Sequence, residues 1–350
     1  MKKNSFRQKV AFRVDISKEI GTGHFMRCLT IADELSKYGI TSVFFCRSLD
    51  TPHQNILVEK GHQLFRLTEN CSSEIGVLES GPGFISHADW LAVSQKDDAE
   101  ECIRQLKKNS WLCLIVDHYG IDRTWEQKVN PYISKLVVID DLADRHHHCD
   151  LLIDQNLGRN IADYRDLISE HCILLLGTSY ALLRPEFLKM RSRDSIKTEQ
   201  SSNFKILVTM GGVDKDNYTQ HVLEALNSCD LPVKTKVTVV LSKSSPWVDA
   251  IQNIKLSFNY RIDVLVGVDN MAELMSSSDI AFGAAGMTSW ERCCLGLPTL
   301  CFVIAENQRN GAVHLQEEGA IAIVNRDDLS VGSLQLKFDE LLNPEKWSMM

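Results

Sequence analysis

The sequence predicts an α/β protein with two doubly wound halves, each a mostly parallel sheet covered by helices on both faces. Three observations carry this prediction. Apolar runs of strand length alternate with segments of helical periodicity from end to end. A polar, charged stretch, Lys189–Asn203, divides the series in two. Glycines and charged residues follow the ends of the apolar runs, and 350 residues suit two domains of ordinary size.

In the first half, the predicted strands are Val10–Ile16, Ser42–Arg47, Leu112–Val116, Lys135–Ile139, Leu151–Ile153 and Ile173–Leu176. Their near-continuous apolar character is typical of parallel strands buried on both faces. In the second half they are Lys205–Met210, Lys236–Leu241, Ile262–Val266, Ile280–Phe282, Thr299–Val303 and Ala320–Val324. We therefore expect an N-terminal domain at 1–187, a linker at 188–203 and a C-terminal domain at 204–350, with a cleft between the two.

Composition narrows the class of function. The net charge of −8, with no basic stripe, argues against a nucleic-acid surface. No apolar run approaches the roughly 20 residues of a membrane-spanning helix. The eleven cysteines are scattered and mostly lie in apolar runs, which favours reduced thiols in a cytoplasmic protein. We expect a small-molecule partner, no nucleic acid and no membrane, and the sequence favours no particular oligomeric state.

The segment after the first strand combines features of an active site. Gly21, Thr22 and Gly23 form a turn that lets the backbone approach a ligand, and a helical pattern follows. A helix N-terminus offers N–H groups to an anion such as a phosphate. His24, in the first helical turn, can exchange a proton near neutral pH. The segment predicts an enzyme acting on a phosphorylated or nucleotide-linked substrate, and a histidine that merely caps the helix is the alternative.

Small residues recur at strand ends in the second half. Gly211-Gly212 and Gly283-Ala284-Ala285-Gly286 each lie between a predicted strand and a helix. In open parallel sheets ligands bind at the carboxyl ends of the strands. Two such loops can wrap a diphosphate with backbone N–H groups, although small residues also simply tighten βα turns. Glu291 could accept hydrogen bonds from ribose hydroxyls or offset the helix dipole.

Other polar groups have open roles. Asp15 is a candidate to orient His24 or to pair with Arg27, or it is a strand-end charge. Asp117-His118-Tyr119 offers a second acid, base and phenol. His146-His147-His148-Cys149 argues against a zinc site, because consecutive residues point in different directions. Asp140-Asp141 could bind Mg²⁺ or only end a strand. We predict no metal and no cofactor.

Set together, these residues resemble one family. The motifs that carry the resemblance are Arg13-Val14-Asp15, Gly21-Thr22-Gly23-His24, Arg27-Cys28-Leu29, Val116-Asp117-His118-Tyr119, Ile139 to Arg145, Asp150 to Asn156, Leu176 to Phe187, Met210 to Asp214, Gly286 to Cys293 and Gly296-Leu297-Pro298. Together they resemble the PseG-type hydrolases of UDP-2,4-diacetamido-2,4,6-trideoxy-β-L-altropyranose, which belong to the GT-B group. The resemblance spans nearly the whole chain.

The resemblance implies two Rossmann-like domains and metal-independent hydrolysis of a UDP-sugar in pseudaminic acid synthesis, and hence flagellin glycosylation. It implies His24 as the general base toward a water that attacks the anomeric carbon, with UDP leaving and the configuration inverting. The expected catalytic residues are His24, Asp15 and Tyr119. The expected substrate-binding residues are Gly21, Thr22, Gly23, Arg27, Asp117, His118, Gly211, Gly212, Gly283, Gly286, Met287, Thr288, Glu291, Asn307 and Gln308.

Two other functions stay open at this point. A UDP-sugar glycosyltransferase of the same fold would transfer the sugar to an organic acceptor. A non-catalytic nucleotide-sugar binding protein would leave the ligand intact. The chain ends at Glu345–Met350, soon after its last helical pattern. Because the resemblance implies one more helix, we expect a truncated or variant C-terminus.

Overall fold

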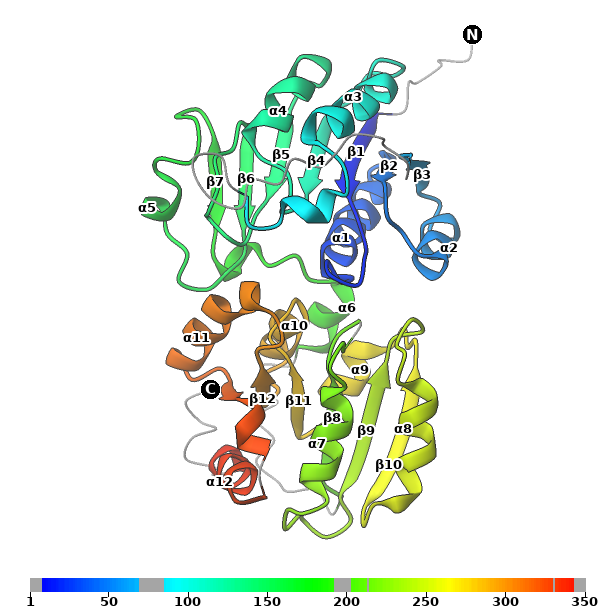
Figure 1. Ribbon diagram of the computed structural model, residues 1–350, viewed down its shortest axis with the longest axis vertical. Coiled ribbons are helices and arrows are strands. Elements are labelled where there is room, and N and C mark those ends of the chain that lie inside the picture. The colour runs from blue at the N-terminus through cyan, green and yellow to red at the C-terminus, as the bar shows by residue number, and fades with distance from the viewer. Residues whose placement is uncertain (1–7, 69–84, 192–202, 213, 330, 343–350) are drawn as a thin grey trace. The chain divides into compact units, whose positions relative to one another are not determined.

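The chain forms two compact units, Met1–Leu182 and Leu183–Met350 (Figure 1). The computed structural model describes residues 8–68, 85–191, 203–212, 214–329 and 331–342. Most of the predicted linker (188–203) lies outside these residues, as does the C-terminal end (343–350). The division falls just before the short helix α6 (Pro185–Met190), whose Phe187 is buried in the core of the C-terminal unit.

The N-terminal unit is built on one parallel sheet of seven strands. Its order is β3-β2-β1-β4-β5-β6-β7, and every neighbouring pair is parallel. The strands are β1 (Lys9–Val14), β2 (Thr41–Cys46), β3 (Gln63–Arg66), β4 (Cys113–Asp117), β5 (Leu136–Ile139), β6 (Leu151–Asp154) and β7 (Ile173–Leu176). All six strands predicted from the first half of the sequence are present, and β3 is an additional one.

Helices cover both faces of this sheet. They are α1 (Gly23–Lys37), α2 (Thr51–Glu59), α3 (Gln95–Leu106), α4 (Arg123–Val129) and α5 (Ile161–Tyr164), with short 3-10 turns η1 (Ala88–Leu91), η2 (Asn130–Tyr132) and η3 (Thr178–Tyr180). Successive side chains of β1 point to opposite faces. Phe12 packs with Phe25 of α1, whereas Ala11 joins the core that contains Trp125 of α4. Burial on both faces explains why the strands are apolar throughout.

The C-terminal unit repeats this plan with six parallel strands in the order β10-β9-β8-β11-β12-β13. The strands are β8 (Lys205–Thr209), β9 (Lys236–Leu241), β10 (Arg261–Val266), β11 (Ile280–Ala284), β12 (Thr299–Phe302) and β13 (Ala322–Val324). The helices are α6, α7 (Tyr218–Leu226), α8 (Val248–Ile254), α9 (Met271–Ser276), α10 (Thr288–Cys294), α11 (Arg309–Glu317) and α12 (Val331–Leu342), with η4 (Lys255–Ser257), η5 (Glu306–Gln308) and η6 (Arg326–Leu329). The prediction of two doubly wound α/β domains is confirmed.

In each sheet the first strand along the chain lies in the middle, and the order in which strands are added reverses once. In the first sheet the chain runs outward from β1 to β3, then returns to pair β4 with the other side of β1. In the second sheet β8 and β11 have the same relationship. At such a switch point the loops after the two central strands diverge, which leaves a crevice for ligands. The segments that begin at Gly21 and Gly211 follow β1 and β8, so both stand at a switch point. Within the described residues, the helices are too short or too polar to span a membrane.

Candidate active site

His24 is placed by the turn that joins β1 to α1. Gly21 has a φ of +73°, a conformation that glycine adopts without strain, and its N–H donates to the carbonyl of Ser17 over 2.9 Å. Thr22 is the N-cap residue of α1, and its carbonyl accepts the N–H of Met26. The helix begins at Gly23, so His24 stands in the first turn as predicted. Its side chain is almost fully buried.

Asp117, at the end of β4, holds the His24 ring. The Nδ1 atom of His24 lies 2.6 Å from Oδ1 of Asp117. Because a carboxylate only accepts hydrogen bonds, a neutral ring carries its proton on Nδ1, and Nε2 is then the basic nitrogen. The pairing crosses the switch point, since β1 and β4 are neighbours there. The geometry is that of an oriented general base.

Arg27, one turn after His24 on α1, holds Asp117 in place. Its Nε lies 2.5 Å from Oδ2 and its Nη2 lies 2.7 Å from Oδ1 of the same carboxylate, a two-point pairing. Burial alone would raise the pKa of Asp117, but Arg27 and His24 outweigh burial and hold that pKa well below its usual range. Burial opposes the charge on Arg27 too, yet Asp117 and Asp141 raise the pKa of its guanidinium. Both groups are therefore ionised.

A second carboxylate extends the network to the predicted phenol. Oδ2 of Asp141, two residues after β5, accepts hydrogen bonds from Nη1 of Arg27 over 2.6 Å and from the hydroxyl of Tyr119 over 2.5 Å. Burial and the charge of Asp141 raise the pKa of Tyr119 well above its usual value, so the phenol keeps its proton. The structure thus brings together four of the predicted site residues: His24, Arg27, Asp117 and Tyr119.

Aromatic rings cluster beside His24. The ring of Tyr119 meets that of His24 edge-on, with 4.5 Å between centroids and 84° between planes. The ring of Trp90, in η1, stacks on that of Tyr119 with 5.5 Å between centroids, and the ring centroids of His87 and Trp90 are 4.3 Å apart. Burial lowers the pKa of His87. Trp90, His87 and Asp141 were not among the predicted site residues. Nothing in the local sequence marks Trp90 and His87, whereas Asp141 was noted only as a strand end or an Mg²⁺ ligand.

Asp15 does not take the role predicted for it, because Asp117 occupies both positions expected of it. Asp15 pairs with Arg13 over 2.8 Å and accepts the backbone N–H groups of Arg47 and Ser48. Nε2 of His118 lies 3.3 Å from Oδ2 of Asp15. Burial lowers the pKa of His118, and its Nδ1 accepts the N–H of Gly120. Asp15 and His118 are therefore both buried and held by protein groups, and neither contacts the His24–Asp117 pair as a second acid or base.

The candidate metal ligands are engaged in protein contacts. Asp140 pairs with Arg145 over 2.8 Å and accepts the hydroxyl of Tyr164. His147 is held by Glu126, with 2.7 Å between Nδ1 and Oε1. Within the described ranges no group of three or more histidine, cysteine or acidic side chains is arranged to hold a metal ion.

In the C-terminal unit the two predicted glycine loops follow paired strands. Gly211-Gly212 comes directly after Thr209 and Met210 at the end of β8, and Gly283 of β11 is in register with Thr209. The prediction that Gly283 and Ala284 belong to the second loop is wrong, because both lie within β11 and the loop begins at Ala285. Both loops therefore stand at the carboxyl edge of the sheet, at its switch point. A Cβ on Gly286 would lie 3.7 Å from Nε2 of Gln308, so η5 is close to the second loop as well.

Two arginines make the polar contacts around α10, the helix that carries Glu291. Arg292 is fully buried, and its Nη2 donates to the carbonyl of Ala284 over 2.8 Å, which pins the second loop. Arg184, at the start of α6, pairs with Oε1 of Glu291 over 2.9 Å. Burial raises the pKa of Glu291, and Arg184 opposes that rise. Met287 and Thr288 join the loop to α10, and Asn307 neighbours Gln308 in η5.

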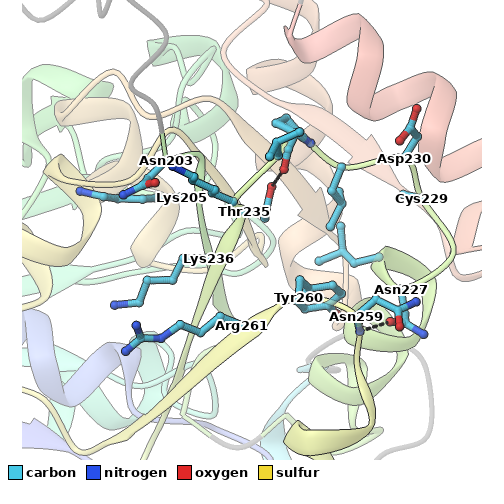
Figure 2. A pocket seen from close by; sticks show the side chains of 15 residues that line it. Asn203, Lys205, Asn227, Cys229, Asp230, Thr235, Lys236, Asn259, Tyr260 and Arg261 are labelled. Atoms are coloured by element: carbon cyan, nitrogen blue, oxygen red, sulfur yellow. Dashed lines mark hydrogen bonds between the residues drawn. The ribbon is translucent and has the colours of Figure 1, made fainter.

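A cavity of about 660 Å³ lies elsewhere in this unit. Lys205, Lys236 and Arg261 are on its wall and extend to the same side (Figure 2). They are also the first residues of β8, β9 and β10, so this cavity lies at the amino edge of the sheet. None of the predicted nucleotide-binding residues lines it.

Comparison with known proteins agrees with this architecture. Residues 205–350 match the glycosyltransferase family 28 C-terminal domain. An uncharacterized protein of Methanocaldococcus jannaschii is 25% identical over 349 residues, which is 95% of this chain and 66% of that protein. The UDP-2,4-diacetamido-2,4,6-trideoxy-beta-L-altropyranose hydrolase of Campylobacter jejuni is 26% identical over 314 residues, 89% of this chain and 97% of that protein.

Among solved structures, MurG of Acinetobacter baumannii superposes with a TM-score of 0.66 at 15% identity, covering 98% of this chain and 93% of that one. Sequence identity at this level shows the fold alone. The two parallel sheets, each with a switch point between its central strands, and the match of the C-terminal half establish that the chain has the GT-B fold.

Proposed function

We propose that the protein hydrolyses a UDP-linked sugar, with His24 as the general base. The observation that carries the proposal is the 2.6 Å pairing of His24 Nδ1 with Asp117 Oδ1 beside the first glycine turn. A positioned base of this kind contributes roughly 10²–10⁴-fold to a rate. An imidazole whose Nδ1–H is held by a carboxylate has its Nε2 free to take a proton.

The proposed reaction has one displacement step. Nε2 of His24 takes a proton from a water as the water oxygen attacks the anomeric carbon. The bond between that carbon and the diphosphate oxygen breaks, so UDP leaves with the electron pair and the configuration inverts. Asp117 stabilises the imidazolium that forms, as the carboxylate of a catalytic triad does. Trp90 and Tyr119 supply an apolar wall beside the base, which suits a low-polarity sugar face.

The nucleotide is assigned to the C-terminal unit. Backbone N–H groups of Gly211-Gly212 and of Gly286, which follows β11 and precedes α10, would receive the diphosphate and stabilise the charge that develops on it. Glu291 would accept the ribose hydroxyls, since its Oε1 is already paired with Arg184 and its Oε2 is a further acceptor. Gln308 lies against the second loop and supports this assignment.

The sugar to test first is the one named for the relative from Campylobacter jejuni, UDP-2,4-diacetamido-2,4,6-trideoxy-β-L-altropyranose. The identity of 26% over nearly the full length of that protein, together with the motif resemblance, supports this choice. The route would then be pseudaminic acid synthesis.

A glycosyltransferase is the second candidate, favoured by the match of residues 205–350 to a glycosyltransferase family domain. Such an enzyme would use the same base to deprotonate an acceptor hydroxyl rather than a water. It would release UDP only when an acceptor is present. A non-catalytic binding protein would leave the UDP-sugar intact throughout.

The deciding experiment offers a panel of UDP-sugars in H₂¹⁸O without any acceptor and follows products by chromatography and mass spectrometry. Hydrolysis by attack at the anomeric carbon puts ¹⁸O in the free sugar and none in UDP. Label in UDP would place the attack at phosphorus and contradict the mechanism. Turnover only after an organic acceptor is added would favour the transferase, and unchanged UDP-sugar would favour the binding protein.

A further inference from the structure

Asp141 links two parts of the candidate site that the chain brings from different strands. One carboxylate oxygen, Oδ2, accepts from the hydroxyl of Tyr119 over 2.5 Å and from Nη1 of Arg27 over 2.6 Å. Tyr119 follows β4, Arg27 stands on α1, and Asp141 follows β5. Through Arg27 the same carboxylate connects to Asp117 and so to the ring of His24.

The backbone of Asp141 is also held by hydrogen bonds. Its carbonyl accepts the amide of Asn156 over 3.0 Å and Nη2 of Arg159 over 2.7 Å. Arg159 is in turn paired with Asp154. A residue whose backbone is fixed by hydrogen bonds and whose carboxylate makes two charge-assisted hydrogen bonds can hold the partners of that carboxylate to within about half an ångström.

Tyr119 needs such a partner. A buried phenol with a single rotatable O–H can point in several directions unless an acceptor fixes it. The hydroxyl is committed to Asp141, and the ring is packed between His24 and Trp90. The pKa of Tyr119 is raised by burial and by Asp141, which agrees with a neutral hydroxyl that donates to this carboxylate.

We propose that Asp141 is a positioning residue for the hydrolytic reaction: it orients Tyr119 against His24 and, through Arg27, sets the Asp117–His24 pair. The inference rests on the proposed function. It assigns Asp141 no contact with the reacting atoms. A purely structural carboxylate would instead stabilise the unit without any specific effect on Tyr119 or on turnover.

The experiment combines a double-mutant cycle with a spectroscopic readout that does not depend on activity. Asp141→Asn keeps the shape of the side chain and an oxygen for Arg27 and Tyr119 while removing the charge. Tyr119→Phe removes the other end of the contact. Turnover is measured for wild type, each single variant and the double variant. In parallel, the Cζ signals of the tyrosines are followed by NMR after ¹³C labelling, and Tyr119 is assigned from its loss in Tyr119→Phe.

Asp150→Asn is the control, because Asp150 also carries an ion pair, to the exposed Lys135 over 2.6 Å, in the same unit. We expect Asp141→Asn to shift the Tyr119 signal and to lower kcat about tenfold, with KM changing less. In the Tyr119→Phe background the same change should lower kcat about threefold or less, a coupling of the size found between residues in one network. Asp150→Asn should leave turnover within about twofold, as substitutions outside a network do.

Each result is decisive. An unshifted Tyr119 signal, or effects of the two substitutions that simply multiply, would overturn the positioning role while leaving the hydrolase proposal intact. A wild-type protein that releases no UDP from any sugar would overturn the proposed function, and the positioning role with it. If Asp141→Asn lowers the melting temperature, Asp141→Glu should restore the fold but not the Tyr119 signal.

Discussion

The Nδ1 atom of His24 lies 2.6 Å from Oδ1 of Asp117, although the two residues are 93 positions apart in the chain. The pairing fixes which ring nitrogen is the base. It also makes a clear prediction for His24→Asn, which keeps polarity but removes the base. Turnover should fall by about 10²-fold or more. UDP affinity should change little, since the proposed nucleotide contacts belong to the C-terminal unit.

His53→Asn is the control for this variant. His53 also stands in a first helical turn and pairs with an aspartate, with 2.5 Å between its Nδ1 and Oδ1 of Asp50, but it is outside the site. It should keep turnover within a few-fold. Turnover, UDP binding by calorimetry and melting temperature are measured on both variants. Near-normal turnover with a lower melting temperature in His24→Asn would make His24 a structural histidine. His118 is then no substitute, because it is buried against Asp15.

Asp117→Asn should cost stability as well as activity. The change takes away the carboxylate that pairs with the buried guanidinium of Arg27, a loss worth about 3 kcal/mol or more for a buried ion pair. Because the pKa of Asp117 is lowered in the folded state, its stabilising effect is complete above the unfolded pKa near 4 and is lost as the pH falls below it. Urea unfolding at several pH values tests both statements. Glu34→Gln, in an exposed pair with Lys37, should leave the unfolding curve unchanged. Equal curves for Asp117→Asn and wild type at pH 7 would contradict the ion-pair argument.

Asp154 should give the opposite pH dependence. The hydroxyl of Tyr164 lies 2.8 Å from Oδ2 of both Asp154 and Asp140, and one O–H cannot donate to two carboxylates at full strength. Burial and the nearby charge of Asp141 raise the pKa of Asp154 to about 6. A raised carboxyl pKa means that the folded state binds the proton more tightly, so this contribution to stability is lost as the pH rises from about 4 to about 6.

The measurement compares Asp154→Asn with wild type. From pH 4 to pH 7 the unfolding free energy of the variant should rise relative to wild type by about 3 kcal/mol, since two units of pKa correspond to that amount. Chemical unfolding across this pH range provides the two curves. Parallel curves would mean that Asp154 titrates normally in the folded protein.

Substitutions at Gly283, within β11, and at Gly286, in the loop that follows, should distinguish an effect on folding from an effect on binding. A Cβ on Gly283 would collide with the guanidinium of the buried Arg292 and lie 3.1 Å from the carbonyl of Thr209. A Cβ on Gly286 would meet only Gln308, at 3.7 Å. Gly283→Ala should therefore cost about 1–3 kcal/mol, as overpacking does, whereas Gly286→Ala should leave the melting temperature unchanged.

Gly286→Ala should weaken UDP binding if the loop receives the diphosphate, because added bulk keeps phosphate oxygens from the backbone N–H groups. The Cβ of Gly283→Ala is directed at Arg292 instead, so this variant should keep its UDP affinity as long as it folds. Calorimetric titration with UDP on the two purified variants measures this. Unchanged affinity in Gly286→Ala would remove this loop from the proposed nucleotide site.

Turnover should survive a strong chelator. The two carboxylates considered as metal ligands are already committed, Asp140 to Arg145 and Tyr164, and Asp141 to Arg27 and Tyr119. Activity is measured before and after exhaustive treatment with EDTA. Loss of turnover that returns on adding Mg²⁺ or Zn²⁺ would restore Asp140 and Asp141 as ligands.

The strands could be predicted because strands buried on both faces carry an apolar residue at nearly every position. β3 was missed for the converse reason. It is an edge strand of four residues, Gln63–Arg66, with a half-exposed surface, and its pattern does not differ from that of a loop. The position of His24 could be predicted as well, since the turn that places it is local.

The partners of His24 could not be predicted, because they depend on which strands become neighbours. Asp15 is close to His24 in sequence and was expected beside it. It is held instead by Arg13, a buried arginine within β1 that also pairs with Asp98 of α3. Asp117 takes the role because β4 pairs with β1 across the switch point. Periodicity shows where strands occur, but not their order in the sheet.

The position of β1 between β2 and β4 also has a consequence for folding during synthesis, because its two neighbours are made at different times. In a nascent chain that contains only β1, β2 and β3, the sheet has three strands and β1 is an open edge. The second neighbour of β1 is β4, which begins only at Cys113. Such an edge readily pairs with other chains. The arrival of β4 covers the edge of β1 and moves the open edge to β4, which later pairs with β5, and the same event delivers Asp117 to His24 and Arg27. The step that makes β1 an internal strand is therefore also the step that assembles the base.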